Sequence, residues 1–229
     1  RVSMHDQATR VLVVRHGETM FNREKRFQGW LDIPLSDFGS AQARACAAYL
    51  ARSPFIPVTR IYSSPLCRAQ QTAKAISEAL GAGLVTDERL REIDVGRIAG
   101  MTWEEVAGEY PQLMEEYRRN PTATRYPGGE SVLDVWDRAK DLLMHIVETH
   151  RGETVVVVGH AIILKALICH ILRLEAPNHR RLTLGNASLS VAEAGVERGG
   201  FSGRVTRLND RHYLEHAGLD AYTADVDAG

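Results

Sequence analysis

The sequence contains few cysteines and no excess of either charge. Its 229 residues include three cysteines, Cys46, Cys67 and Cys169, which stand far apart without the Cys-x-x-Cys or Cys/His spacing of a zinc site. Reduced thiols and a cytoplasmic location are therefore expected. The 28 basic and 29 acidic side chains leave a formal charge of -1, so no overall positive field favours nucleic acid or an anionic membrane as a partner.

Long apolar runs are also absent. The most apolar stretch, residues 154–172, is interrupted by a glycine, two histidines and a lysine, which favours a strand followed by a helix over a membrane-spanning helix. Residues 1–10 are polar and lack the apolar core of a secretory signal. With 44% apolar residues, the chain is expected to form a single domain over residues 1–229.

The sequence instead alternates short β-branched runs with amphipathic stretches. The expected strands are 11–14, 59–63, 84–86, 154–158, 187–193 and 203–208. Helical spacing of apolar residues covers about 35–53, 64–80 and 132–150. Ser64 is expected as the N-cap of the second helix, with Pro65 at its first position. This order predicts an α/β fold: a three-layer α/β/α sandwich with a mainly parallel central sheet and a small helical cap at about 98–127.

Three of the expected strands are followed by basic side chains. Arg15 and His16 follow the first strand, Arg68 lies just past the second, and His160 follows 154–158. The carboxyl ends of parallel strands share one edge of a sheet, so these side chains are expected to converge on one pocket. Arginine forks suit phosphoryl oxygens, at about 1.5 to 3 kcal/mol per charge-assisted bond. No aspartate cluster suggests a magnesium site, so no metal and no other cofactor is expected.

Five segments together resemble a known family. They are Arg15-His16-Gly17-Glu18-Thr19, Ser64–Ala73, Leu90–Gly96, Pro127–Ser131 and Gly159-His160. In this order, across nearly the whole chain, they resemble the histidine phosphatase superfamily, also called the phosphoglycerate mutase-like family, and in particular its phosphatase-type branch. Either the first triplet or the final Gly-His pair alone would be a weak signal.

The resemblance implies a role for each matching residue. His16 would be the nucleophile, Arg15 and Arg68 would clamp the phosphoryl group, and His160 would donate to its oxygens. Glu92 matches the proton donor of the family.

Further matches concern substrate binding. Asn22 matches an asparagine that helps to bind the phosphate, and Gln28 with Gly29 matches a loop that flanks the pocket. Ala161, which follows His160, and the segment 98–100 depart from the usual family residues and are expected at the pocket wall.

The chemistry of these groups gives a mechanism. Neutral His16 would attack phosphorus in line, while Arg15 and Arg68 stabilise the charge on the equatorial oxygens. Protonated Glu92 would give a proton to the leaving alkoxide and then, as carboxylate, take one from the water that hydrolyses the phosphohistidine. We therefore expect activity to fall on the alkaline side.

The expected function is a metal-independent phosphomonoesterase that acts on a small phosphorylated metabolite. Phosphoserine, α-ribazole phosphate and sugar or glycerate phosphates are all plausible substrates. A cofactor-dependent phosphoglycerate mutase with the same phosphohistidine is one alternative, and a catalytically dead binding module is another. The short interval between Glu92 and His160 favours the phosphatase, because family mutases carry a longer cap there. The sequence leaves a homodimer open.

Overall fold

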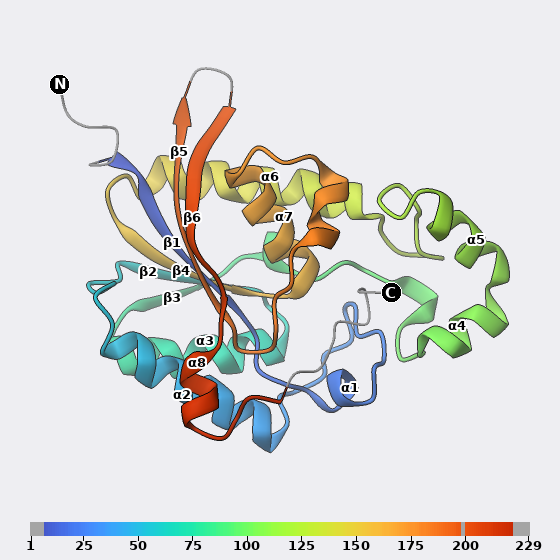
Figure 1. Cartoon of the computed structure of the whole chain (residues 1–229), viewed down its shortest axis with the longest axis horizontal. Coiled ribbons are helices and arrows are strands. Elements are labelled where there is room, and N and C mark those ends of the chain that lie inside the picture. Colours follow the sequence, from blue (N-terminus) through green and yellow to red (C-terminus); the bar gives the residue numbers. More distant parts are fainter. Residues whose placement is uncertain (1–6, 198–199, 222–229) are drawn as a thin grey trace.

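The strands form one sheet in the order β3-β2-β4-β1-β5-β6 (Figure 1). The computed structural model describes residues 7–197 and 200–221. The strands are β1 (Thr9–Arg15), β2 (Arg60–Ser63), β3 (Gly83–Thr86), β4 (Thr154–Gly159), β5 (Leu189–Glu197) and β6 (Gly200–Asp210). β1 to β4 pair in parallel, whereas β5 and β6 add an antiparallel edge. Each predicted strand overlaps one of these six, and the mainly parallel sheet is confirmed.

Helices cover both faces of the sheet. α2 (Asp37–Ala51), α3 (Cys67–Leu80) and α8 (His212–His216) lie on one face, and α6 (Val132–Thr149) and α7 (Ala161–Ile171) lie on the other (Figure 1). Successive side chains of β1 alternate between the two cores: Val11 and Val13 face α6 and α7, whereas Leu12 and Val14 face α2 and α3. The predicted three-layer sandwich is therefore confirmed.

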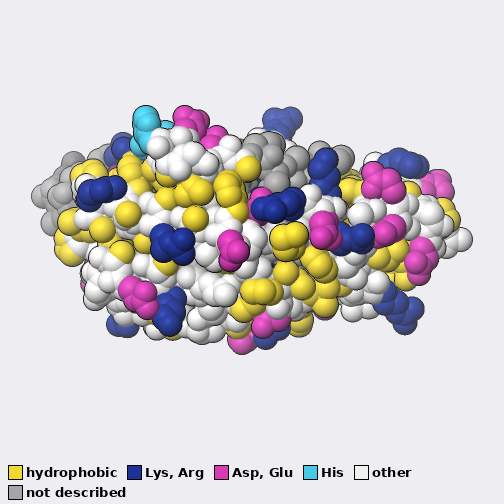
Figure 2. Space-filling view, turned by 90° about the horizontal axis from the view of Figure 1, so that it is seen from below, with side chains coloured by type: hydrophobic (Ala, Val, Ile, Leu, Met, Phe, Trp, Pro, Cys, Tyr) yellow, Lys and Arg dark blue, Asp and Glu magenta, His cyan; other side chains and the backbone are white. Residues whose placement is uncertain are grey.

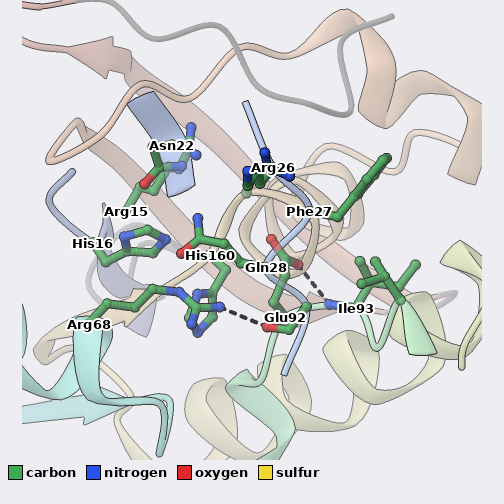
Figure 3. Close-up of a pocket in the computed structure, with 13 residues that line it drawn as sticks. Arg15, His16, Asn22, Arg26, Phe27, Gln28, Arg68, Glu92, Ile93 and His160 are labelled. Carbon is green, nitrogen blue, oxygen red and sulfur yellow. Dashed lines mark hydrogen bonds between the residues drawn. The ribbon is translucent and has the colours of Figure 1, made fainter. Parts of the chain in front are cut away.

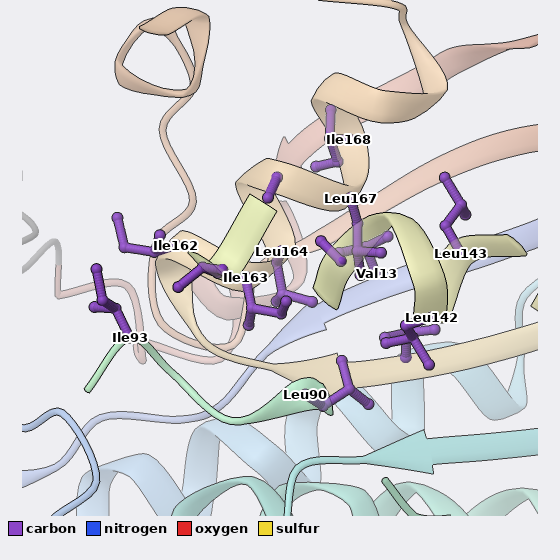
Figure 4. Close-up of a cluster of buried hydrophobic side chains, with 14 of the residues drawn as sticks. Val13, Leu90, Ile93, Leu142, Leu143, Ile162, Ile163, Leu164, Leu167 and Ile168 are labelled. Carbon is purple, nitrogen blue, oxygen red and sulfur yellow. The ribbon is translucent and has the colours of Figure 1, made fainter. Parts of the chain in front are cut away.

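The apolar stretch at 154–172 is explained by its position between these layers. Every residue of β4 is buried, and so is every residue of α7 except His170. Figure 4 shows α7 side chains such as Ile163 and Leu167 packed against Val13 and Leu142. Each such aliphatic side chain contributes about 1.5 to 3 kcal/mol when fully buried. No helix in the described part of the chain is long and apolar enough to cross a membrane.

Two short helices lie in the segment predicted as a cap, α4 (Trp103–Glu109) and α5 (Pro111–Arg119). They extend to one side of the sheet (Figure 1). The side chains of Thr102 and Glu105 form a capping box at the start of α4. Glu105 also accepts a hydrogen bond from Nη1 of Arg26 at 2.9 Å, which joins the first turn of α4 to the loop that contains Arg26.

The remaining regular segments are short. They are α1 (Met20–Arg23) and the 3-10 turns η2 (Glu88–Leu90), η3 (Gly96–Ile98) and η4 (Ala176–Arg181). On the face that Figure 2 shows, side chains of both charges alternate with apolar patches, as expected for a formal charge of -1. Residues 1–6 of the polar start lie outside the described residues, and the single-domain boundary of 1–229 stays a prediction.

The predicted start of α3 was wrong. The helix begins at Cys67, and its N-cap is Leu66, which makes no side-chain capping bond. Pro65 disfavours the helical conformation at the preceding residue, so Ser64 stays extended at the end of the strand. The chain turns two residues later than expected, which frees the Ser64 hydroxyl for another partner.

Candidate active site

Two histidines meet at the carboxyl edge of the sheet. His16 directly follows β1, His160 directly follows β4, and the backbone N–H of His16 donates to the carbonyl of Gly159 at 3.0 Å. Their ring centroids lie 5.0 Å apart, and both residues are buried (Figure 3). The parallel pairing of β1 with β4 thus brings together two side chains that are far apart in the sequence.

The surroundings of His16 leave its Nε2 nitrogen ready to attack. Nδ1 lies 2.7 Å from the carbonyl oxygen of Gly17, an obligate acceptor, so Nδ1 carries the proton and Nε2 keeps its lone pair. Burial, followed by the charges of Arg68 and Arg15, holds the pKa of His16 well below 6.5. The ring is therefore neutral, and nucleophilic at Nε2, at neutral pH.

His160 has the same tautomer but turns its other nitrogen to a protein partner. Its Nε2 lies 2.8 Å from Oγ of Ser64, and that oxygen already accepts the backbone N–H of Leu66 at 3.3 Å. Because the Ser64 hydroxyl has no other acceptor among the described residues, we assign its proton to the bond with Nε2, which places the ring proton on Nδ1. Within the described residues, Nδ1 of His160 is buried without a hydrogen-bond partner. Burial and the charge of Arg68 hold the pKa of His160 well below 6.5, so this ring can offer a donor to a ligand while staying neutral.

Arg68 is fixed by two carbonyl groups. Its Nη1 donates to the carbonyl of Leu31 at 2.7 Å. Its Nη2 donates to the carbonyl of Gly29 at 2.8 Å (Figure 3). Its Nε is buried with no partner among the described residues. Burial lowers the pKa of Arg68 to about 10, so the guanidinium remains charged at neutral pH. Arg15, at the end of β1, donates from Nη1 to the carbonyl of Leu184 at 2.5 Å.

Two amides are oriented by Thr19. Its backbone N–H donates to Oδ1 of Asn22 at 3.0 Å, and its hydroxyl donates to Oε1 of Gln28 at 2.9 Å. Asn186 also donates to Oδ1 of Asn22, at 3.3 Å. With these oxygens occupied, the NH₂ groups of Asn22 and Gln28 are the ends left to donate to a ligand. Thr19 lies within the first motif, but its orienting role needed the structure.

Glu92 joins the site from the loop between η2 and η3. Its Oε1 accepts the backbone N–H of Ile93 at 2.9 Å, and its Oε2 accepts that of Ile162, in the first turn of α7, at 3.2 Å. The carboxyl group is nearly buried, with a residue exposure of 9%. Two main-chain bonds thus hold Glu92 beside His160.

All nine residues predicted for the site line one pocket (Figure 3). They are Arg15, His16, Asn22, Gln28, Gly29, Arg68, Glu92, His160 and Ala161. The sequence interpretation missed four further lining residues, Arg26, Phe27, Ile93 and Val95. Each of the four lies within four residues of a predicted one, which was the available signal. No group of three His, Cys, Asp or Glu residues that could hold a metal ion occurs in 7–197 or 200–221.

The segment 98–100 is not at the pocket wall, contrary to expectation. Ile98 is fully buried in the core under α6 and α7. Gly100 instead bonds to the loop behind the pocket, through its N–H to the carbonyl of Phe27 at 2.7 Å and its carbonyl to Arg26. The departure from the usual family residue at position 98 therefore concerns core packing and not the pocket.

Buried histidines and arginines at the carboxyl edge of a parallel sheet define an α/β protein that binds a phosphoryl group. The chain belongs to the histidine phosphatase superfamily: the model of its branch 1 matches residues 11–211. Phosphoserine phosphatase 1 of Hydrogenobacter thermophilus is 36% identical over 94% of this chain and 99% of its own length. A probable phosphoglycerate mutase of Yersinia pestis is 37% identical over 79% of this chain and 82% of its own.

Solved structures give the same picture. A mycobacterial glucosyl-3-phosphoglycerate phosphatase in complex with VO₃ matches with a TM-score of 0.79 and 31% identity, over 88% of this chain and 99% of the other. A phosphoserine phosphatase of Entamoeba histolytica with bound phosphoserine matches with a TM-score of 0.75 and 27% identity, over 90% and 99%. The activity class is accordingly phosphoric monoester hydrolysis, and the mutase alternative is less favoured.

Proposed function

We propose that the chain hydrolyses a small phosphorylated metabolite by passing its phosphoryl group to Nε2 of His16. The observation that carries this proposal is the bond from Nδ1 of His16 to Gly17, which frees Nε2 in a buried pocket lined by Arg15 and Arg68. A neutral imidazole beside two fixed cations suits attack on a dianionic phosphoryl group.

The other side chains have complementary roles. The Nδ1 proton of His160, Nε of Arg68 and the amide of Asn22 donate to the equatorial oxygens, where charge accumulates. Glu92 in its protonated form transfers a proton to the departing alkoxide and so breaks the P–O bond without releasing a strong base. As carboxylate it then takes a proton from water, whose oxygen attacks the phosphohistidine and releases inorganic phosphate.

The substrate class we propose is a phosphorylated hydroxy acid of the size of phosphoserine or phosphoglycerate. Phe27, Ile93 and Val95 add apolar side chains to the pocket lining, which suits the short carbon chain of such a substrate. Arg26 adds a third cation to the lining and suits a substrate carboxylate. Relatives named as phosphoserine and glucosyl-3-phosphoglycerate phosphatases support this class.

A direct test is hydrolysis of phosphoserine, 3-phosphoglycerate and p-nitrophenyl phosphate with EDTA present. We expect free phosphate from the intact protein and none from His16→Ala. Brief mixing with radiolabelled substrate followed by alkaline quench should trap an alkali-stable, acid-labile label on the protein. Turnover by His16→Ala at the rate of the intact chain would eliminate His16 as the nucleophile.

The same assay separates the two alternatives. With 3-phosphoglycerate, a mutase returns the isomer, whereas a hydrolase releases phosphate. A binding module turns over none of the three compounds. We also propose a cytoplasmic location, supported by three free cysteines, two of them buried. The homodimer stays a prediction, and light scattering can distinguish it from a protomer of 25.4 kDa.

A further inference from the structure

The loop that carries Glu92 is held by one side chain from α6. Nη1 of Arg138 donates to the carbonyls of Arg89 at 2.9 Å and Arg91 at 2.6 Å, and Nη2 donates to that of Glu92 at 2.9 Å. Residues 91–95 belong to no helix or strand, so no backbone ladder fixes this segment. The carbonyls of Arg89, Arg91 and Glu92 thus share a single guanidinium as donor, and that of Glu92 has Nε1 of Trp30 as a second one.

Arg138 is itself locked in place. Nη2 pairs with Oε2 of Glu130 at 2.9 Å, and both side chains are largely buried. The same carboxylate oxygen accepts the backbone N–H of Asp94 at 2.9 Å, and the N–H of Glu130 donates to the carbonyl of Asp94 at 2.7 Å. The pair thus fixes the loop on both sides of Glu92.

The position of this backbone decides where the carboxyl group lies. The side chain of Glu92 has only short-range support from Ile93 and one bond of 3.2 Å to Ile162. A shift of about 1 Å in the loop is enough to misplace a catalytic group, and such errors cost about 10²-fold in rate. Trp30 also donates to the Glu92 carbonyl, at 2.7 Å, but in the described structure it donates to neither of the other two carbonyls.

We infer that Arg138 is a positioning residue for proton transfer by Glu92, a role that rests on the proposed function of Glu92 as the general acid. Loss of its fork would leave the hydrogen bonds of the phosphoryl clamp intact, because none joins Arg138 to the two arginines or the two histidines of the site in the described structure. Arg138 acts on His160 only through its charge, a smaller cause of that ring's low pKa than burial or Arg68, and Arg138→Lys preserves this charge. The loss of kcat/KM should therefore be larger for a basic leaving group, which must be protonated as it departs, than for a weakly basic one.

The experiment measures kcat/KM for phenyl phosphate and p-nitrophenyl phosphate, two esters of similar shape. This parameter reports the transfer to His16, before water attacks. p-Nitrophenolate leaves without a proton, whereas phenolate gains from one. For Arg138→Gln we expect a loss of about 10²-fold with phenyl phosphate and of less than about threefold with p-nitrophenyl phosphate. Arg138→Lys, which keeps the charge without the fork, should fall between the intact chain and Arg138→Gln.

A double-mutant cycle with Glu92→Gln tests whether the effect acts through Glu92. In the Glu92→Gln background, Arg138→Gln should cost less than about threefold with phenyl phosphate, because the proton donor is already gone. Arg125→Gln is the control: Arg125, like Arg138, bonds main chain and a carboxylate, here the carbonyl of Gly129 and Asp134, but nothing in 89–92. This variant should leave kcat/KM for both esters unchanged.

Two results would overturn the inference in distinguishable ways. Equal losses for both esters, or full additivity with Glu92→Gln, would make Arg138 a general support of the fold and leave the role of Glu92 intact. If Glu92→Gln itself affected both esters equally, the general-acid assignment would be wrong and the positioning role would be wrong with it. If Arg138→Gln does not fold, the same comparison is made with Arg138→Lys.

Discussion

Ser64 selects the nitrogen of His160 that carries the proton. Its hydroxyl has one acceptor among its described contacts, Nε2 of His160 at 2.8 Å. Ser64→Ala removes that donor and allows the proton to move to Nε2, which turns a lone pair toward the phosphoryl oxygens. We expect kcat/KM to fall about 10- to 100-fold, the usual effect of losing an orienting partner. Nitrogen-15 NMR of the His160 ring should show the change of tautomer.

Ser63→Ala is the control for that substitution. Ser63 is equally buried, and its hydroxyl donates to the carbonyl of Ser64 at 3.0 Å without contacting a histidine. Both variants create a similar void, so a difference between them isolates the bond to His160. Equal losses in the two variants, with no change in the NMR tautomer, would refute the tautomer argument.

Arg68 acts on both the phosphoryl group and the histidines. Removing one preorganised donor to a charged transition state costs about 10²- to 10³-fold, so we expect that loss in kcat for Arg68→Ala. After burial, the charge of Arg68 is the largest cause of the low pKa of His16 and of His160. NMR titration should therefore show both pKa values rising in Arg68→Ala. A loss below threefold would contradict the role of Arg68 as a phosphoryl clamp.

The loop at 127–130 is packed against the Glu92 loop so closely that only glycine fits at position 129. A Cβ at Gly129 would lie 2.2 Å from the carbonyl oxygen of Asp94. Gly129→Ala must push these segments apart, at about 1 to 3 kcal/mol of unfolding free energy. Gly108→Ala in α4 is the matched control, since its Cβ meets nothing within 4 Å and alanine favours a helix by about 0.5 to 1 kcal/mol. Urea unfolding should show opposite signs for the two variants, and equal signs would refute the packing argument.

At the level of elements, the residue pattern predicted those strands and helices that interactions between neighbouring residues determine. The β-branched run at 11–14 and the helical spacing at 132–150 are set by neighbouring residues, and both elements formed there. The basic residues after the strands were predictable because parallel strands align their carboxyl ends. Ser64 and Arg138 were not, because their partners lie far along the chain, up to 96 residues for the bond of Ser64 to His160. No spacing rule carries that information.

Across the whole molecule, the site places two neutral histidines between two packed layers. His16 and His160 lie where β1 and β4 leave the sheet, with cores of apolar side chains on both faces. Burial is accordingly the largest cause of the low pKa of each ring. Unfolding restores an ordinary histidine pKa near 6.5. The low pKa that keeps each ring neutral for catalysis therefore also makes the free energy of unfolding depend on pH.

This linkage predicts how stability depends on pH. For both rings the folded pKa lies below the unfolded value of 6.5, so below pH 6.5 the unfolded chain binds protons that the folded chain does not. Stability is thus fully present above about pH 6.5 and falls as pH decreases toward the folded pKa values, by up to about 1.4 kcal/mol per pH unit for each ring. Urea unfolding between pH 6.5 and about pH 5.5, one unit above the reference glutamate pKa of 4.5, isolates the histidines, because about nine-tenths of ordinary carboxylates remain ionised there. His16→Ala should reduce this slope by about one proton, whereas a slope that is flat in the intact chain would show that the rings are protonated in the fold and cannot serve as neutral nucleophile and donor.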